Sequence, residues 1–146
     1  MKKNYIIILA LLLIVTGCTK KSTLEDLQYN NWEEDVPNYI NVDSSYAEPD
    51  NPSNSDIWIY LSFNENSIEQ EWTNISSLHA SFQKVMFGTP IGTPIYRTVT
   101  FNNGKAIFEP DGTANNTTYN FQFYMTFDNG RTTSWSPIYQ MTTPPF

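Results

Sequence analysis

Few side chains in this 146-residue sequence belong to types that perform catalysis. His79 is the only histidine, and the local alternation places it on the polar side of a predicted strand, without the neighbouring nucleophile that nucleophilic catalysis requires. Glu69 and Glu71 could form the carboxylate pair of a glycosidase. They flank Gln70 in a short polar segment, so we interpret them as surface charges. The sequence therefore predicts a protein that is not an enzyme.

Metal and cofactor chemistry is also disfavoured. Asp111, Thr113 and Asn115 have the spacing with which a calcium loop begins. The position of the closing acid is held by Gln122, so the segment is better interpreted as a turn rich in Asn and Asp. A zinc site needs three or four Cys or His ligands, and the chain has one Cys and one His. A phosphate-binding glycine loop is absent as well, so we expect no metal and no cofactor.

Outward-facing aromatic side chains are the remaining candidates for a site. The strand predicted before Asn129 and Gly130 alternates between apolar residues and a second face that carries Tyr124. If Asn129 and Gly130 are the central residues of a type I′ turn, Tyr124 lies opposite Trp135, and Tyr139 lies further along the same face. The sequence therefore predicts an aromatic strip of Tyr124, Trp135 and Tyr139 on the outside of a hairpin.

Two interpretations of this strip remain open. In the first, the contact between Tyr124 and Trp135 stabilises the hairpin, as aromatic pairs do by about 1 kcal/mol. In the second, the strip is the surface that binds a glycan or a protein partner. Trp58 and Tyr60 form a second candidate patch, because the segment 57–63 alternates and places its apolar residues on the opposite face.

The elements that carry these residues are all predicted to be strands. Short alternating segments separated by turn signals, such as the one at 102–104, predict an antiparallel sandwich. Phe108, Pro110 and Tyr119 resemble the tyrosine-corner region of fibronectin type III and related immunoglobulin-like domains. This resemblance implies an all-β, immunoglobulin-like sandwich over residues 56–146, with the hydroxyl of Tyr119 tied back to the preceding connection.

The amino-terminal residues predict export. Lys2 and Lys3 precede an apolar run at 5–15, which is shorter than the roughly 20 residues that span a bilayer and is typical of a signal peptide. The sequence "VTGC" that ends at Cys18 resembles the lipobox of bacterial lipoproteins. The resemblance implies that residues 1–17 are removed and that Cys18 is acylated, and the following Thr19 resembles a signal for sorting to the outer membrane.

The segment after Cys18 is distinguished by its charge and composition. Residues 18–55 are acidic and rich in Asn, Ser and Pro, which predicts a flexible tether with a first strand near 38–43. Without residues 1–17 the chain has 6 basic and 15 acidic residues, since two lysines and no acid are lost. This balance disfavours nucleic acid and an anionic membrane surface, so membrane attachment depends on the lipid.

Three functions are compatible with these expectations. We favour a non-catalytic binding module for a glycan or protein ligand at the cell envelope. A structural or assembly subunit that adds an edge strand to a partner is the alternative. A small cell-wall or glycan hydrolase is disfavoured, because a compact sandwich rarely offers a cleft with a carboxylate pair.

Overall fold

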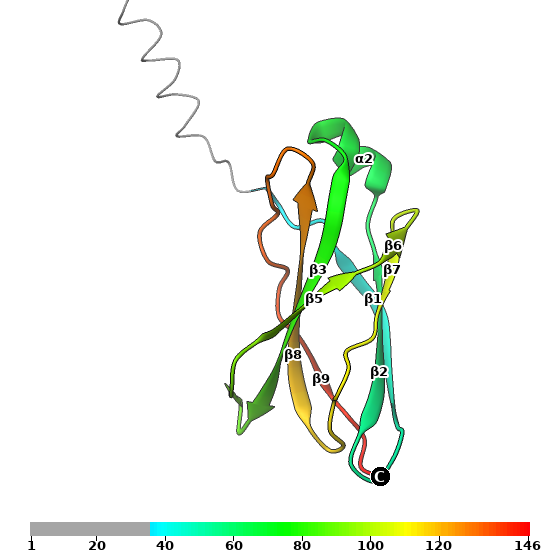
Figure 1. Cartoon of the computed structure of the whole chain (residues 1–146), viewed down its shortest axis with the longest axis vertical. Helices are drawn as coiled ribbons and strands as arrows, with labels where there is room; N and C mark the ends of the chain where they lie inside the picture. The colour runs from blue at the N-terminus through cyan, green and yellow to red at the C-terminus, as the bar shows by residue number, and fades with distance from the viewer. Residues whose placement is uncertain (1–35) are drawn as a thin grey trace, which may run out of the picture. The chain divides into compact units, whose positions relative to one another are not determined.

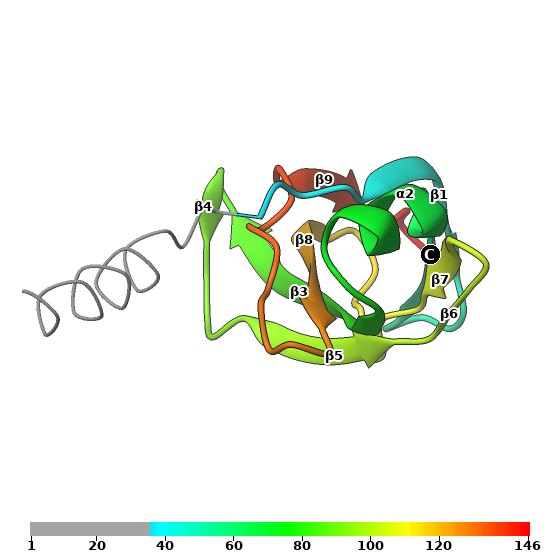
Figure 2. The same ribbon diagram turned by 90° about the horizontal axis from the view of Figure 1, so that it is seen from above.

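The computed structural model describes residues 36–146 and shows two antiparallel sheets packed as a β-sandwich (Figures 1 and 2). The first sheet has the strand order β1 (Asn41–Pro49), β2 (Ser55–Ser62), β7 (Lys105–Phe108) and β6 (Phe101–Asn102). The second has the order β4 (Thr89–Pro90), β3 (Ile75–Met86), β8 (Thr118–Phe127) and β9 (Tyr139–Thr142), and β5 (Ile95–Val99) also pairs with β3. The predicted all-β sandwich is confirmed, and the arrangement is compatible with an immunoglobulin-like domain.

Alternating apolar residues from both sheets form the core. Because successive strand residues point to opposite faces, one face of each central strand is apolar and buried. The most deeply buried members are Ile57, Ile59 and Leu61 on β2, Leu78, Ala80 and Phe82 on β3, and Phe121, Phe123 and Met125 on β8. The alternate residues of β3 and β8 therefore form an outer face.

One short helix, α2 (Glu65–Glu71), closes one end of the sandwich (Figure 1). The side chain of Asn64 caps it by accepting a hydrogen bond from the backbone N–H of Ser67, and Ile68 is its buried anchor. A seven-residue helix depends on such packing for its stability, because isolated helices of this length are marginal.

The hairpin predicted at 102–104 is present and joins β6 to β7. Asn103 and Gly104 have φ values of 50° and 69°, as a type I′ turn requires. A Cβ atom on Gly104 would lie 2.2 Å from the carbonyl oxygen of Phe63. Glycine is therefore needed here for its backbone conformation and for close packing.

The sandwich begins earlier than the predicted boundary at residue 56. The strand expected near 38–43 is β1, which spans Asn41–Pro49 and pairs along the whole of β2. The side chains of β1 are mostly polar and exposed, so the strand has no apolar alternation from which its full length could be predicted. The predicted leader, Cys18 and the tether up to residue 35 lie outside the described residues.

The turn between β8 and the following segment differs from the predicted one. The N–H of Gly130 donates to Phe127 O at 2.9 Å, and the N–H of Phe127 donates to Arg131 O at 2.9 Å. Gly130 has a φ of 82°, so Asp128 and Asn129 are the central residues and Gly130 follows in the left-handed region. This is the three-residue loop with a glycine bulge and not the two-residue type I′ turn.

This loop and Pro137 change the register that the sequence predicted. Because Pro137 lacks an N–H, regular pairing resumes only at Tyr139. Tyr139 there lies opposite Phe121, whereas the prediction paired Phe121 with Ile138. A shift of one residue moves a side chain to the other face of the sheet. Tyr139 therefore lies on the core side and not on the outer face.

The predicted tie of Tyr119 is observed. Its ring is buried, and its hydroxyl accepts a hydrogen bond from the backbone N–H of Ala114 at 2.8 Å. The contact fastens the start of β8 to the connection that precedes it, as the tyrosine-corner resemblance implied.

Candidate ligand-binding surface

The outer face of the second sheet carries a shallow groove of about 180 Å³. Its floor consists of alternate residues of β3 and β8, and its walls come from β5 and from the segment before β9. Lining residues are Ser81 and Gln83 on β3, Asn120 and Gln122 on β8, Pro94 and Tyr96 on one side, and Trp135 and Ile138 on the other. None of these residues is charged, so the groove is neutral, with apolar walls and a polar floor.

Trp135 is held in place by its two neighbours. Ser134 donates its N–H to Val36 O at 2.8 Å, and its own carbonyl accepts from Asn38 Nδ2 at 2.8 Å. Ser136 is buried, and it exchanges two hydrogen bonds with the backbone of Phe123, one through its N–H and one through its Oγ. With residues 134 and 136 fixed, the indole of Trp135 is directed outward and is 42% exposed.

A chain of ring contacts surrounds Trp135. Its indole meets the ring of Tyr124 edge to face at 4.5 Å between centroids, which confirms the predicted neighbourhood of these two residues despite the altered register. Tyr124 in turn stacks on His79 at 4.5 Å, and Trp135 approaches Tyr96 at 6.2 Å. The indole of Trp135 is therefore supported from below by Tyr124, and Tyr96 lies on its other side.

His79 belongs to this cluster and is not an exposed base. Its Nε2 lies 2.7 Å from Ser77 Oγ, and partial burial lowers the pKa of the imidazole below its ordinary value. Neutral His79 therefore acts as a flat surface that supports Tyr124.

The amides of the floor are oriented by hydrogen bonds. Gln122 donates Nε2 to Ser136 O at 3.0 Å, Gln83 donates Nε2 to Gly92 O at 2.6 Å, and Asn120 accepts from Gln140 at 2.9 Å. An amide has two N–H donors and an oxygen with two lone pairs. One bond fixes each orientation and leaves further donor and acceptor capacity beside the groove.

Tyr139 does not belong to this surface, so its predicted place in the strip is wrong. It lies opposite Phe121, packs against the core, and its hydroxyl lies 2.5 Å from Ser45 Oγ on β1. The physical reason is the register change at Pro137. Tyr139 instead links the edges of the two sheets.

The second predicted patch lies on the outer face of the first sheet. Trp58 stacks on Tyr46 with centroids 5.7 Å apart, and Tyr60 is 41% exposed. Tyr46 donates its hydroxyl to Glu48 at 2.9 Å, and this hydrogen bond raises the pKa of the phenol. The two predicted patches are thus on opposite faces of the sandwich.

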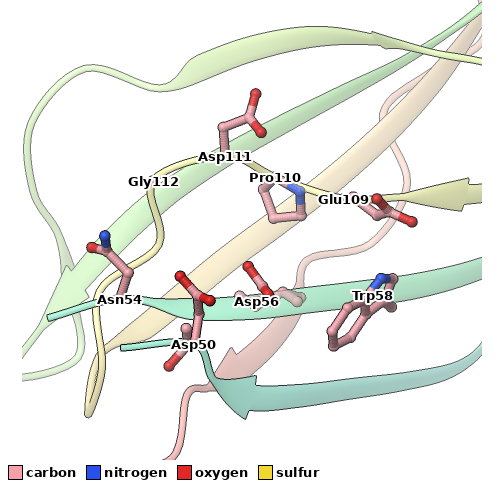
Figure 3. Close-up of a pocket in the computed structure, with 10 residues that line it drawn as sticks. Asp50, Asn54, Asp56, Trp58, Glu109, Pro110, Asp111 and Gly112 are labelled. Atoms are coloured by element: carbon pink, nitrogen blue, oxygen red, sulfur yellow. The ribbon is translucent and has the colours of Figure 1, made fainter. Parts of the chain in front are cut away.

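Trp58 borders a pocket of about 290 Å³ at the turn between β1 and β2 (Figure 3). Its lining is acidic, with carboxylates of Asp50, Asp56, Glu109 and Asp111, and it includes neither lysine nor arginine. Within residues 36–146 no group of three or more His, Cys, Asp or Glu side chains has the arrangement of a metal site. The pocket and the groove therefore differ in charge.

The other residues considered from the sequence make structural contacts. Glu71 accepts a hydrogen bond from the Tyr39 hydroxyl, and Glu69 accepts one from the backbone N–H of Ile75. Thr113 donates to Ser55 O, and Asn115 donates Nδ2 to Asn51 O at 2.7 Å. The Asn- and Asp-rich segment thus fastens the connection before β8 to the turn between β1 and β2.

Tyr96 and the floor amides were missed from the sequence. The alternation in the segment 95–99 could have placed Tyr96 on the outer face of a strand. The apolar face of this segment is interrupted by Arg97, however, so the pattern was weak. Only the pairing of β5 with β3, in which Ser81 lies opposite Tyr96, shows that Tyr96 reaches the groove.

No protein-family model matches the chain, and no curated protein matches it.

Among residues 36–146 no helix is long and apolar enough to cross a membrane.

Proposed function

We propose that this protein is a lipid-anchored protein of the bacterial cell envelope whose sandwich binds a neutral glycan without catalysis. The observation that carries the proposal is the groove, in which aromatic walls stand over a floor of oriented amides. A sugar ring has an apolar C–H face, which stacks on an aromatic ring, and hydroxyls that exchange hydrogen bonds with amides. Both kinds of contact are available within one hollow.

Preorganisation supports this assignment. The Trp135 backbone is fixed on both sides, and its ring packs on Tyr124. A ligand that meets rigid side chains loses little further conformational entropy on binding. The neutral lining favours an uncharged saccharide over an acidic one, because an anion would find no cation among the residues of the groove.

The anchoring part of the proposal rests on the sequence. The leader and "VTGC" resemble a lipoprotein signal, so Cys18 would carry the acyl chains and residues up to 35 would form the tether. In this proposal the sandwich is of the fibronectin type III or immunoglobulin-like family, and the tied Tyr119 supports that assignment. The outer membrane is the proposed location.

A glycan array tests the binding function. Residues 19–146 are the suitable probe, because the whole apolar core lies within the compact unit Asp35–Phe146. We expect binding to neutral oligosaccharides, and Trp135→Ala should weaken it at least tenfold. Tyr46→Ala, which removes an exposed aromatic from the opposite face, is the matched control and should bind normally.

Absence of any glycan binding by the wild-type probe, or equal weakening by both variants, would contradict the proposal. Hydrolysis of a bound oligosaccharide that disappears with Glu69→Gln or Glu71→Gln would show that the protein is a hydrolase instead.

A further inference from the structure

Phe87 stands at the tip of the hairpin that joins β3 to β4, and its side chain is 100% exposed. Met86 lies opposite Thr89, so Phe87 and Gly88 are the two turn residues. Their φ values are 50° and 79°, which defines a type I′ turn. In Figure 2, β4 lies at the margin of the molecule, away from β1 and β7.

The second type I′ turn of this protein shows how unusual Phe87 is. Asn103 has the same φ of 50°, and it is followed by Gly104 as Phe87 is followed by Gly88. Asparagine tolerates the left-handed region, whereas a bulky residue there is an outlier. The ring of Phe87 is wholly exposed, so intramolecular packing does not offset the strain. Strain of this kind is characteristic of functional sites.

The chemistry around the tip indicates what Phe87 contacts. The 12 residues 85–96 contain no charged side chain, and Met86 beside the tip is 47% exposed. The nearest charge along β3 is the exposed Lys84, three residues from Phe87, or about 10 Å of strand. An apolar tip with a cation about 10 Å behind it matches the boundary between the hydrocarbon and the phosphates of a lipid bilayer.

The hairpin is also held rigid close to the tip. Ile91 donates its N–H to Lys84 O at 2.8 Å, and Gln83 donates to Gly92 O at 2.6 Å. These bonds hold the returning strand against β3, so the apolar residues are presented without further ordering. The cost of ordering a flexible loop is thus avoided on binding.

We infer that the hairpin of β3 and β4 inserts Phe87 and Met86 into the surface of a lipid bilayer, with Lys84 at the level of the phosphates. This contact is independent of the acylation of Cys18 and of glycan binding. It orients the sandwich on the membrane. Because the chain is acidic overall, the contact favours zwitterionic over anionic lipid.

Vesicle flotation tests the inference with residues 19–146, which lack Cys18 and the leader. Wild-type protein should float with phosphatidylcholine vesicles at millimolar lipid, and less with vesicles that contain phosphatidylglycerol. Phe87→Asn should reduce the partition coefficient into the vesicles about tenfold, because the free energy of transfer falls with the apolar area that is lost. It should not lower the melting temperature, because asparagine suits this turn.

Two further variants complete the design. Phe87→Trp keeps an aromatic anchor that prefers the membrane interface and should bind at least as well as wild type. Ile107→Thr removes an apolar side chain that is 49% exposed on the other sheet and should bind normally. The inference is overturned if wild-type protein does not bind protein-free vesicles, as expected if Phe87 instead fits a pocket of a partner protein. Equal binding by Phe87→Asn and wild type overturns it as well.

Discussion

The two outer faces of the sandwich both display aromatic side chains, but they differ in what surrounds them. Trp135, which packs on Tyr124, lines a groove with neutral amides. Trp58, which packs on Tyr46, lines a pocket with four carboxylates. Aromatic rings alone therefore do not identify a binding face in this protein. The charge of the neighbouring polar groups is what distinguishes the two faces.

The faces also differ in how firmly their aromatic residues are held. Trp135 lies in a segment fixed by Asn38 and by the buried Ser136. Tyr46 lies on an edge strand, and its polar contact is an exposed hydrogen bond to Glu48. Rigid placement favours recognition, because less entropy is lost on binding.

The largest predicted effect on stability comes from removing the Ser136 hydroxyl, which helps to hold the backbone of Trp135 in place. Ser136→Ala leaves the buried N–H of Phe123 without its side-chain acceptor, which should cost about 2 kcal/mol of unfolding free energy. It should also weaken glycan binding, although residue 136 contributes no wall to the groove. Urea unfolding and titration calorimetry measure the two effects. Ser134→Ala, at an exposed neighbouring position, is the control; equal losses in both variants would contradict the positioning role.

Removal of one central ring from each face should have unequal consequences. Tyr124 contacts both His79 and Trp135, so Tyr124→Ala should cost about 1–2 kcal/mol and reduce glycan affinity. Tyr46→Ala should cost less stability than Tyr124→Ala and leave affinity unchanged, because Tyr46 is exposed on an edge strand. Thermal unfolding with and without saccharide measures both. If binding persists in Tyr124→Ala, the ring cluster only supports the hairpin.

The acidity of the first face should be visible as a stability defect. Glu48 and Asp56 are both exposed and lie directly opposite each other on β1 and β2. Like charges in this position destabilise a sheet, so Asp56→Asn should raise the unfolding free energy by about 0.5 kcal/mol. The gain should shrink in 1 M salt, where charges are screened. A gain that is independent of salt would mean that repulsion is not its cause.

The sequence predicted much of this arrangement, because alternation is a local property. The apolar faces of β2, β3 and β8 followed from periodicity, and the contact between Tyr124 and Trp135 followed from the position of the turn. The sequence Asp128–Gly130 fits two kinds of loop, however, and the choice between them depends on hydrogen bonds further along the chain. The place of Tyr139 depended on that choice and was therefore wrong.

Long-range pairing was the part that the sequence could not supply. Tyr96 reaches the groove because β5 pairs with β3, and β1 joins the sandwich through a backbone ladder although its side chains are mostly polar. Such pairings depend on tertiary context more than on local propensity. The groove could therefore be identified only in part from the aromatic residues.

The smallest predicted effect is a pH dependence confined to the groove face. Burial lowers the pKa of His79 below 6.5, so the folded chain binds fewer protons than the unfolded chain once the pH falls below about 6.5. The contribution of neutral His79 to the free energy of unfolding is therefore fully present above this pH. It decreases as the pH falls toward the lower pKa that His79 has in the folded chain. His79→Gln lacks this titration and keeps every other ionisable side chain of the wild type. Urea unfolding of both proteins between pH 8 and 5 should show the advantage of wild type decreasing below pH 6.5. A difference that stays constant over this range would show that the imidazole beside Tyr124 is not protected from protonation.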